Sequence, residues 1–400
     1  MLSVDEAVTA ILRGAAPLEA EAMPLAKLTG RIAAEDVIAQ LTQPPFAASA
    51  MDGYAVRFAD VKTGVSLKVI GEAPAGAPFK GEIRTGEAVR IFTGGVIPDG
   101  ADHVIIQEKV TRDGERITVT ETADAPRHIR PAGIDFKKGD RLAQAGERLH
   151  EIHGAIFAAG NISEARVIGR PTVALFSNGD ELIEPGGDLR PGEIVNSNHY
   201  ALSAMVERWG GAPEYLGRAA DNEDAIREFF ARARNADIIV PIGGASVGDY
   251  DFVKTAFAKE GGDIVFEKVA VRPGKPTWHG RLGSARIIGL PGNPASAIVT
   301  AALFVQPLAR RLAGHAATEG SVFEKAALSR PLKANSAREA YLRAEVSPLV
   351  YGYNAVPADD QDSSLLFPFA RSNALIRRLA NAPAAKEGDE VEILWLRQAA

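Results

Sequence analysis

The sequence predicts a multidomain chain of α/β and β parts, with a central doubly wound α/β sheet domain. The length of 400 residues is sufficient for two to four domains. Strand-like and helix-like segments alternate from about 170 to 312, which is typical of a parallel or mixed sheet covered by helices on both faces. Short β-runs separated by Gly, Pro and Asp dominate residues 67–142 and again 320–400, so both stretches predict β-rich domains.

Composition excludes several classes of protein. Because the chain has no cysteine, disulfides, zinc–thiolate sites and a cysteine nucleophile are excluded. The net charge of −6, without a long basic run, argues against a nucleic-acid partner. The most apolar stretch, 295–305, is too short to span a bilayer, and no signal peptide is visible. We therefore expect a cytoplasmic protein that does not contact membranes.

The first 168 residues combine a short helix, a mixed segment and a β-rich segment. Residues 2–13 have helical spacing behind Ser3, and Glu6 completes a capping box. Arg112–Glu115 predicts a hairpin turn, and residues 147–168 predict a helix followed by a strand. The strands expected between them are Leu67–Ile70, Ala88–Phe92, His103–Gln107 and Ile117–Thr120.

The remaining elements follow from the change of period along the chain. Central strands are expected at Thr172–Phe176, Glu214–Ala219, Asp237–Ile242, Ile264–Val271 and Arg286–Leu290. Central helices are expected at Asn198–Trp209, Glu223–Arg234, Phe252–Lys259 and Pro294–Leu312. Strands of the last domain are expected at Tyr341–Val346, Ala374–Arg378 and Glu390–Leu396.

Four polar loops each follow a predicted central strand: 177–181, 243–251, 272–276 and 291–294. Loops after parallel strands emerge at one edge of a sheet, which is where open α/β sheets bind ligands. Asn293 and Pro294 suit the start of a helix, whose free N–H groups attract anions. The loops also contain close-approach glycines, basic groups and carboxylates: Gly243, Gly244, Gly248, Gly274, Gly292, Arg272, Lys275, Asp180, Glu181, Asp249 and Asp251. This combination suits a phosphorylated ligand with a divalent cation.

A second cluster of Gly-rich polar turns lies in the first third of the chain. It comprises the turn at Asp52, the turn Phe92–Gly95 that contains Thr93, and the turn Arg130–Asp135. Taken singly, each is explained by ordinary turn chemistry.

Other motifs give weaker hypotheses. Gly244–Gly248 reads G-x-S-x-G between a strand and a helix, so Ser246 could be a hydrolase nucleophile. The acid and base would be Asp263 and either His279 or His315, although Gly248-Asp249 delays the helix that such an elbow needs. His150 and His153 are three residues apart, whereas a helical zinc motif has its two histidines four apart.

Six sequence blocks in a fixed order resemble the molybdopterin molybdenumtransferases, the MoeA and gephyrin E-domain family. They cover Pro45–Ala55, Arg90–Gly95, Gly179–Leu182, Gly243–Asp249, Pro273–Pro276 and Leu290–Ser296. The resemblance implies an elongated four-domain subunit that forms a homodimer, with a MogA-like central domain, a bipartite N-terminal region and a small C-terminal β-barrel-like domain. It implies domains at 1–64 with 141–168, 65–140, 169–316 and 317–400.

The resemblance also implies a reaction. Molybdate is inserted into adenylylated molybdopterin, AMP is released, and Mg²⁺ assists. Because the chain lacks cysteine, both sulfurs that hold molybdenum must come from the pterin. The implied partners are a molybdopterin adenylyltransferase and molybdenum-enzyme apoproteins or cofactor carriers. A non-enzymatic pterin-binding scaffold stays open, because family members also anchor other proteins.

Roles follow residue by residue from the matched blocks. The implied catalytic residues are Asp52, Glu181, Asp221 and Asp249, with Asp52 acting across the dimer interface. The implied substrate-binding residues are Thr93, Asp135, Gly243, Gly244, Ser246, Arg272, Lys275, Pro291, Asn293 and Pro294. The implied metal ligands are Asp180, Glu181, Asp249 and Asp251.

Five positions carry a qualification. Asp221 could instead be the N-cap of the next helix. The chain departs from the family at Pro241-Ile242, where a hydroxyl residue is usual, at Asn178, where Thr is common, and at Arg272, where Lys is common.

Overall fold

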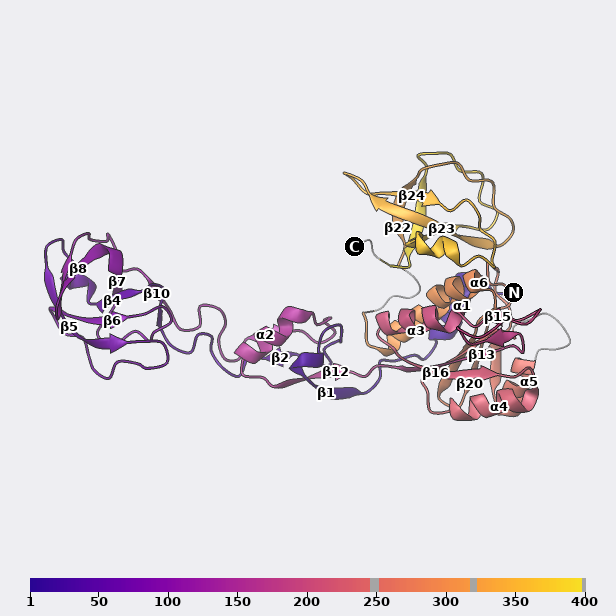
Figure 1. The fold of residues 1–400 in the computed structure, drawn as a ribbon, viewed down its shortest axis with the longest axis horizontal. Coiled ribbons are helices and arrows are strands. Elements are labelled where there is room, and N and C mark those ends of the chain that lie inside the picture. The colour runs from indigo at the N-terminus through magenta and orange to yellow at the C-terminus, as the bar shows by residue number, and fades with distance from the viewer. Residues whose placement is uncertain (245–251, 317–321, 398–400) are drawn as a thin grey trace. The chain divides into compact units, whose positions relative to one another are not determined.

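A computed structural model describes residues 1–244, 252–316 and 322–397. The chain divides into two compact units (Figure 1). The first comprises Met1–Glu21, Gly30–Ala34 and Val167–Ala400, and the second comprises Ala22–Thr29 and Glu35–Arg166. In the described part of the chain, no helix has both the length and the hydropathy needed to cross a membrane.

The first unit is built around a six-stranded sheet whose order is β16-β13-β17-β21-β20-β18. The first four strands run parallel, β20 is antiparallel to β21, and the edge strand β18 is antiparallel to β20. The strands are β13 (Thr172–Asn178), β16 (Ala212–Ala219), β17 (Ile238–Ile242), β18 (Asp263–Phe266), β20 (Trp278–Leu282) and β21 (Ala285–Gly289).

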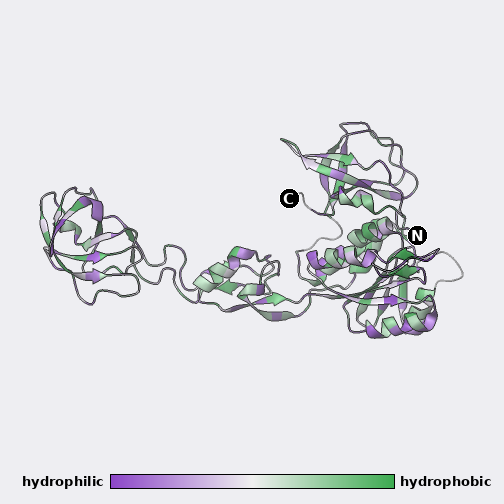
Figure 2. Ribbon diagram, viewed as in Figure 1, coloured by the Kyte–Doolittle hydropathy of each residue, from purple (hydrophilic) through white to green (hydrophobic). Residues whose placement is uncertain are grey.

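Helices cover both faces of this sheet, as the alternation of strands and helices predicts (Figure 1). Val173 and Leu175 of β13 pack with one group of helices, and Ala174 and Phe176 pack with the other, because successive strand side chains point to opposite faces. The first group is α1 (Val4–Leu12), α3 (Asn198–Arg208) and the continuous run α6 (Pro294–Thr300), η4 (Ala301–Val305) and α7 (Gln306–Leu312). The second group is α4 (Glu223–Arg232) and α5 (Phe252–Lys259). Figure 2 shows hydrophilic colour on the outer side of α4.

The prediction of one central strand is wrong. The segment Ile264–Val271 does not form a single strand; the chain forms β18 before Glu267 and β19 (Val271–Arg272) after Lys268. β19 leaves the central sheet and pairs with β23 of the C-terminal domain. The loop 272–276 therefore does not follow a parallel central strand, and β20 was not expected at all.

The C-terminal strands close into a barrel. The pairings run β22-β26-β25-β23-β24 and return to β22, because the long strand β23 pairs with both β24 and β25. The strands are β22 (Glu324–Leu328), β23 (Glu339–Pro348), β24 (Tyr353–Pro357), β25 (Ala374–Arg378) and β26 (Glu390–Trp395). The predicted small β-barrel-like domain is confirmed.

The second unit contains another six-stranded sheet, in the order β7-β4-β6-β5-β9-β8. β8 and β9 form the hairpin expected at Arg112–Glu115. The strands are β4 (Gly53–Val56), β5 (Ser66–Ala73), β6 (Glu87–Ile91), β7 (His103–Ile106), β8 (Val110–Asp113) and β9 (Arg116–Val119).

Shorter elements complete the described part of the two units: β1 (Ala20–Pro24), β2 (Val37–Ile38), β3 (Ala48–Ser49), β10 (Ile129–Arg130), β11 (Arg141–Ala143), α2 (Glu151–Ala159), β12 (Glu164–Ile168), β14 (Leu182–Ile183), β15 (Ile194–Val195) and the 3₁₀ turns Leu25–Lys27, Phe58–Asp60, Gln107–Lys109 and Phe367–Ala370.

The replacement Gly289→Ala is expected to destabilise the central domain. Gly289 pairs with Trp278 across the sheet, and a Cβ at Gly289 would lie 1.8 Å from the indole nitrogen of this fully buried tryptophan. We expect the free energy of unfolding to fall by about 1–3 kcal/mol, the usual cost of overpacking. Urea denaturation would measure this loss. Gly154→Ala in α2 is the control, because its Cβ would meet only Leu25 O at 3.5 Å. Equal stability of the two variants would contradict the packing argument.

Candidate active site

A cavity of about 710 Å³ lies where β13, β17 and β21 end. It is of the size that holds small-molecule ligands. All four expected loops contribute to it, although the loop 272–276 contributes only Pro276. The residues that line it are Ser177, Asn178, Glu181, Leu182, Ile194–Asn198, Ile242–Gly244, Pro276, Pro291–Pro294, Ser364 and Leu366.

The glycine turn after β17 can be formed only by glycine. Gly243 and Gly244 have φ of 98° and 65°, in the left-handed region. A Cβ on Gly244 would lie 2.4 Å from the Val253 side chain and 2.7 Å from Oδ1 of Asn178. The N–H of Gly243 donates to Leu290 O, so it is not a free donor for a ligand. In the described part of the chain, the N–H groups of Gly244, Gly292 and Asn293 have no acceptor, so they are among the donors that the cavity offers.

The loops after β13 and β16 are joined through two aspartates. The N–H of Asp221 donates to Asp180 Oδ1 at 3.2 Å, and the N–H of Asp180 donates to Asp221 Oδ2 at 3.1 Å. Asn178 Nδ2 also donates to Asp221 Oδ1 at 2.9 Å. The N-cap of α4 is Asn222, whose side chain accepts from Ala225 N. Asp221 is therefore not a helix cap, and that alternative is wrong.

The described carboxylates at this edge suit a magnesium ion that also binds a substrate. Asp180 and Asp221 lie together, and Glu181 lines the cavity beside them. Of the proposed ligands, Asp249 and Asp251 lie outside the described residues, as does Ser246. Among the residues that are described, no three acidic or histidine side chains form a complete metal cage. Magnesium usually takes only one or two carboxylates and fills its shell with water and substrate phosphates, so the residues present fit it.

The start of α6 is partly covered by the C-terminal domain. Asn293 stands at the N-cap position, but its side chain makes no capping bond; its Nδ2 donates to Ser363 Oγ at 3.0 Å. The N–H of Ala295 donates to Ser363 O, also at 3.0 Å. The helix start therefore offers fewer free donors than the sequence suggests. Ser364 and Leu366 enter the cavity from the same segment, which no local pattern links to α6.

A buried polar network forms one wall of the cavity, and the sequence did not predict it. Ser177 Oγ donates to Asn196 Oδ1 at 2.9 Å, and Asn196 Nδ2 lies 2.6 Å from the Tyr215 hydroxyl. Asn198 Nδ2 donates to Gly292 O at 2.7 Å, which ties the start of α3 to the loop after β21. The polar run Asn196–Asn198, directly before a helix, was the available signal.

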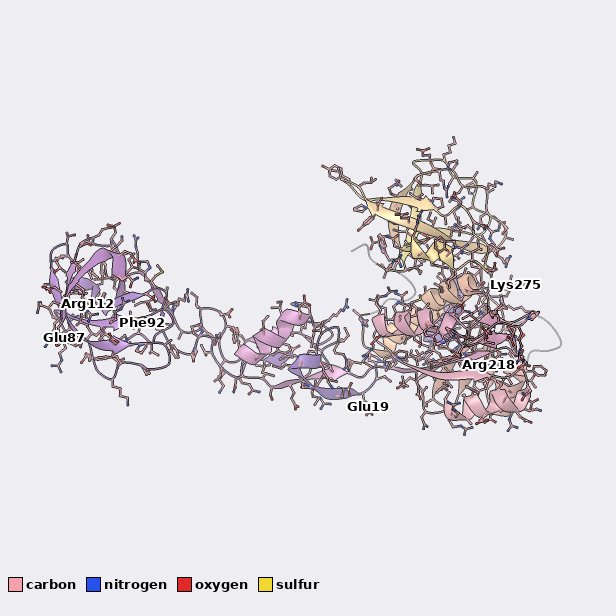
Figure 3. The ribbon with its side chains drawn as sticks, viewed as in Figure 1. Glu19, Glu87, Phe92, Arg112, Arg218 and Lys275 are labelled. Atoms are coloured by element: carbon pink, nitrogen blue, oxygen red, sulfur yellow. The ribbon has the colours of Figure 1, made fainter. Side chains whose placement is uncertain are left out.

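The two expected basic residues do not line the cavity. Arg272 lies on β19 and donates to Asn335 Oδ1 of the C-terminal domain at 3.2 Å. Lys275 is exposed (Figure 3), and its backbone carbonyl accepts a hydrogen bond from the N–H of Val269. Arg272 lies outside the cavity because β19 pairs with the barrel instead of the central sheet.

In the second unit, the three polar turns are held next to each other. Asp52 Oδ1 accepts from the N–H of Thr93 at 2.7 Å and from its hydroxyl at 2.8 Å. Strand β10, just before Asp135, pairs with β3, and the N–H of Asp135 donates to Gln43 O at 3.1 Å. The Arg90 guanidinium lies 4.8 Å from the centre of the Phe92 ring, which Figure 3 labels. The structure thus joins Asp52 and Thr93 directly and places the 130–136 run beside residues 43–49.

The replacement Thr93→Val tests how this turn sets the charge of Asp52. The two hydrogen bonds from Thr93, backbone first, hold the pKa of the Asp52 carboxyl below its usual value. Valine keeps the backbone bond and loses the hydroxyl, so we expect the pKa to rise but to stay below the ordinary value. A lowered folded-state pKa stabilises the fold above the unfolded pKa, and this contribution is lost as the pH falls through the folded pKa. Carboxyl ¹³C NMR titration measures the shift, with Thr85→Val as control; an unchanged Asp52 pKa would contradict the assignment.

The described residues do not form a serine-hydrolase site. His279 is fully buried, its Nδ1 lies 2.7 Å from Ile287 O, and burial lowers its pKa to about 4. His315 lies beside Gly210, just before β16 begins, whereas the cavity lies where the parallel strands end. Neither histidine lines the cavity at the end of β17.

Comparison with known proteins agrees with this architecture. Three family models match in order: the MoeA N-terminal region (domain I and II) at 2–160, a probable molybdopterin binding domain at 174–311, and the MoeA C-terminal region (domain IV) at 325–396. The chain is 37% identical over 388 residues to the molybdopterin molybdenumtransferase of Nostoc sp., covering 94% of this chain and 89% of that protein. It is 40% identical to the Haemophilus influenzae protein of the same name over 78% of each chain.

One solved structure has the same fold over the whole length of this chain. The molybdopterin biosynthesis moea protein from Pyrococcus horikosii matches with a TM-score of 0.84 and 31% identity, covering 100% of both chains. The sequence blocks, the sheet-edge cavity and these matches lead to one conclusion: the chain belongs to the molybdopterin molybdenumtransferase (MoeA) family.

Proposed function

We propose that this chain inserts molybdenum into molybdopterin, using molybdate and adenylylated molybdopterin and releasing AMP. Membership in the molybdopterin molybdenumtransferase family over nearly the whole length makes the chain a transferase of molybdenum cofactor biosynthesis. The observation that supports the chemistry is the cavity at the carboxyl ends of β13, β17 and β21, which combines free N–H donors with the carboxylate of Glu181.

Residues of the cavity would divide the work. The N–H groups of Gly244, Gly292 and Asn293 would donate to phosphate oxygens of the adenylylated substrate. The apolar side chains of Leu182, Ile194 and Leu366 would cover part of its ring system and exclude water. Ser246 keeps its proposed role in substrate binding, and Asp249 keeps its proposed roles as a catalytic residue and a metal ligand; both lie outside the described residues.

Magnesium would be held by Asp180, Asp221 and Glu181 together with oxygens of the substrate. When bound, Mg²⁺ would neutralise charge on the phosphate that leaves with AMP. The mutual hydrogen bonds of Asp180 and Asp221 fix both loops, so both carboxylates, including Oδ2 of Asp180, are positioned before the ion arrives. Glu181 is an exposed carboxylate of the cavity and is placed to accept a proton from an attacking water.

The assembly that we propose is a homodimer. In it, the turns at Asp52, Thr93 and Asp135 of one subunit would complete the cavity of the partner subunit. The support is that Asp52 and Thr93 form an ordered polar turn, with no reaction partner assigned inside their own unit. The substrate would come from a molybdopterin adenylyltransferase, and the product would pass to apoproteins or cofactor carriers.

The proposal is tested by turnover. The purified chain is incubated with adenylylated molybdopterin, Mg²⁺ and molybdate, and AMP is quantified by chromatography. We expect AMP release that depends on molybdate. Binding of the pterin without molybdate-dependent AMP release would instead indicate a scaffold and overturn the enzymatic proposal.

A further inference from the structure

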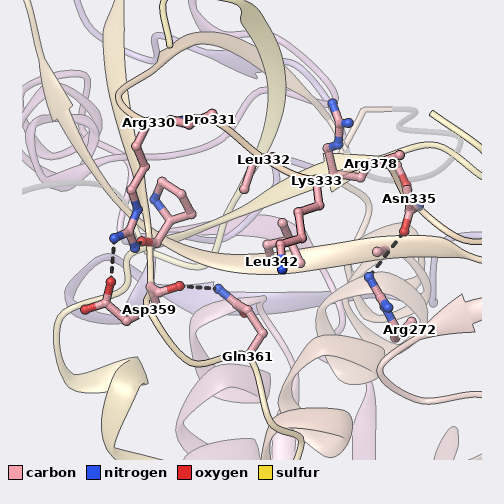
Figure 4. Close-up of a pocket in the computed structure, with 14 residues that line it drawn as sticks. Arg272, Arg330, Pro331, Leu332, Lys333, Asn335, Leu342, Asp359, Gln361 and Arg378 are labelled. Atoms are coloured by element: carbon pink, nitrogen blue, oxygen red, sulfur yellow. Dashed lines mark hydrogen bonds and ion pairs between the residues drawn. The ribbon is translucent and has the colours of Figure 1, made fainter. Parts of the chain in front are cut away.

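A second hollow, of about 360 Å³, lies between β19 and one side of the C-terminal barrel (Figure 4). It shares no lining residue with the cavity at the sheet edge. Four cationic side chains line it: Arg272, Arg330, Lys333 and Arg378. Asp359 is the one carboxylate residue of its lining. The hollow is therefore strongly positive in a protein whose net charge is −6.

Most of this positive charge has no counter-charge in the hollow. Asp359 forms an ion pair with Arg330, which also donates to Pro357 O, so this arginine is neutralised (Figure 4). Arg272, Lys333 and Arg378 form no ion pair with any described carboxylate. Like charges gathered at one site repel each other, and an anion bound among them would remove that cost.

Two of the three free cations are held in place. Arg272 donates to Asn335 Oδ1 at 3.2 Å. The amide of Asn335 is fixed in turn, because its Nδ2 donates to the carbonyls of Arg338, Arg378 and Leu379 at 2.8–2.9 Å. Arg378 donates to Pro383 O, while its Nε is buried and has no partner in the described structure. Holding these donors in advance lowers the entropy that a ligand must lose to bind.

Lys333 supplies a donor that no other described residue holds. It is exposed, and its ammonium group has no hydrogen-bond or ion-pair partner among the described residues. Figure 4 draws its side chain between the Arg330–Asp359 pair and the Arg272–Asn335 pair. A lysine at this place can close over a ligand that the arginines hold.

We infer that this hollow binds a small tetrahedral oxyanion with two negative charges, of the phosphate and sulfate class. Arginine and lysine N–H groups form their strongest hydrogen bonds with such oxygens, and three cations match a dianion better than a monoanion. Since Arg272 belongs to β19 and Lys333 and Arg378 belong to the barrel domain, the bound anion would also link these two segments. This site is independent of molybdenum transfer, although molybdate has the same shape and charge and is therefore included in the test.

The test is isothermal titration of the full chain with phosphate, sulfate, molybdate and, as a monoanion, nitrate, all at constant ionic strength. We expect one dianion bound per chain in this hollow and much weaker binding of nitrate. Lys333→Gln should weaken dianion binding by about tenfold, the effect of losing one charged hydrogen bond. Lys333→Arg should keep most of the affinity. Lys386→Gln, the same charge change elsewhere on the barrel, is the matched control and should bind like the parent.

Two results would overturn the inference. One is the absence of dianion binding by the parent chain, and the other is equal affinity of the Lys333→Gln variant and the parent for phosphate and sulfate. If molybdate alone bound, and Lys333→Gln did not change it, the bound ion would belong to the sheet-edge cavity. Failure of molybdenum transfer in the AMP assay would leave this test unaffected, because it uses no pterin substrate.

Discussion

Replacing Glu181 by glutamine is expected to lower molybdate-dependent AMP release by about 100-fold or more while leaving the fold intact. Glu181 is an exposed carboxylate that lines the sheet-edge cavity. Its side chain forms no hydrogen bond or ion pair with a described residue, so its replacement leaves no described polar group unpaired. Glutamine keeps the shape and removes both the charge and the basicity. Loss of a positioned acid–base group or metal ligand reduces turnover by roughly 10²–10⁴-fold. Steady-state AMP release would measure kcat, and thermal denaturation would check that the fold is retained.

The matched control for this substitution is Glu214→Gln. Glu214 is also exposed in the central domain, on β16, but it does not line the cavity. Its turnover should equal that of the parent chain. If Glu181→Gln turned over at the parental rate at saturating Mg²⁺, Glu181 would have neither the catalytic nor the metal-binding role assigned to it.

The second large effect is the recovery of AMP release when two inactive variants are combined in one dimer. Asp52→Asn and Glu181→Gln chains are co-expressed with different tags, and the doubly tagged heterodimer is purified. In a two-fold symmetric dimer whose sites each combine Glu181 of one subunit with Asp52 of the other, one of the two sites in this heterodimer is intact. We therefore expect about half of the parental AMP release per dimer, although each homodimer is nearly inactive.

This complementation distinguishes a shared site from a site within one chain. If Asp52 and Glu181 served the same cavity within one subunit, both sites of the heterodimer would carry a substitution, and activity would stay at the level of the homodimers. A heterodimer of two Asp52→Asn chains carrying the two tags is the control for tag and assembly effects. Sedimentation of the parent chain should show a dimer; a monomer at assay concentration would contradict the proposed assembly.

Local patterns predicted the elements that bury side chains on regular faces. The capping box at Ser3 and Glu6 starts α1, and α5 spans Phe252–Lys259 as expected. The helix expected at Pro294–Leu312 is present as one continuous run, with a π-helical segment in its middle. These features depend on residues close together in the sequence, so the sequence alone contains the information.

Predictions failed where a distant strand provided the hydrogen-bond partner. The pattern of Ile264–Val271 suits a strand, but it cannot show that residues after Lys268 pair with Glu339 and Ala340. That pairing moved Arg272 from the expected site to the hollow on the barrel. For the same reason, nothing local showed that Ser363 would take the donors at the start of α6.

The prediction that the loops converge on one cavity is confirmed, whereas predictions about single hydrogen bonds were in part wrong. Glu181, Gly244 and Asn293 do line one cavity. However, the sequence suggested Gly243 as a donor, and the structure uses its N–H to bind Leu290 O. The wall formed by Asn196 and Tyr215 was missed because their network joins segments on different strands and loops.

The most direct test is a crystal structure of the chain soaked with AMP, Mg²⁺ and molybdate. Our account predicts the AMP phosphate in the sheet-edge cavity, within hydrogen-bond distance of the N–H groups of Gly244 and of Gly292 or Asn293, with Glu181 facing the same ligand or its metal ion. AMP bound at any other surface, with this cavity holding only water, would contradict it.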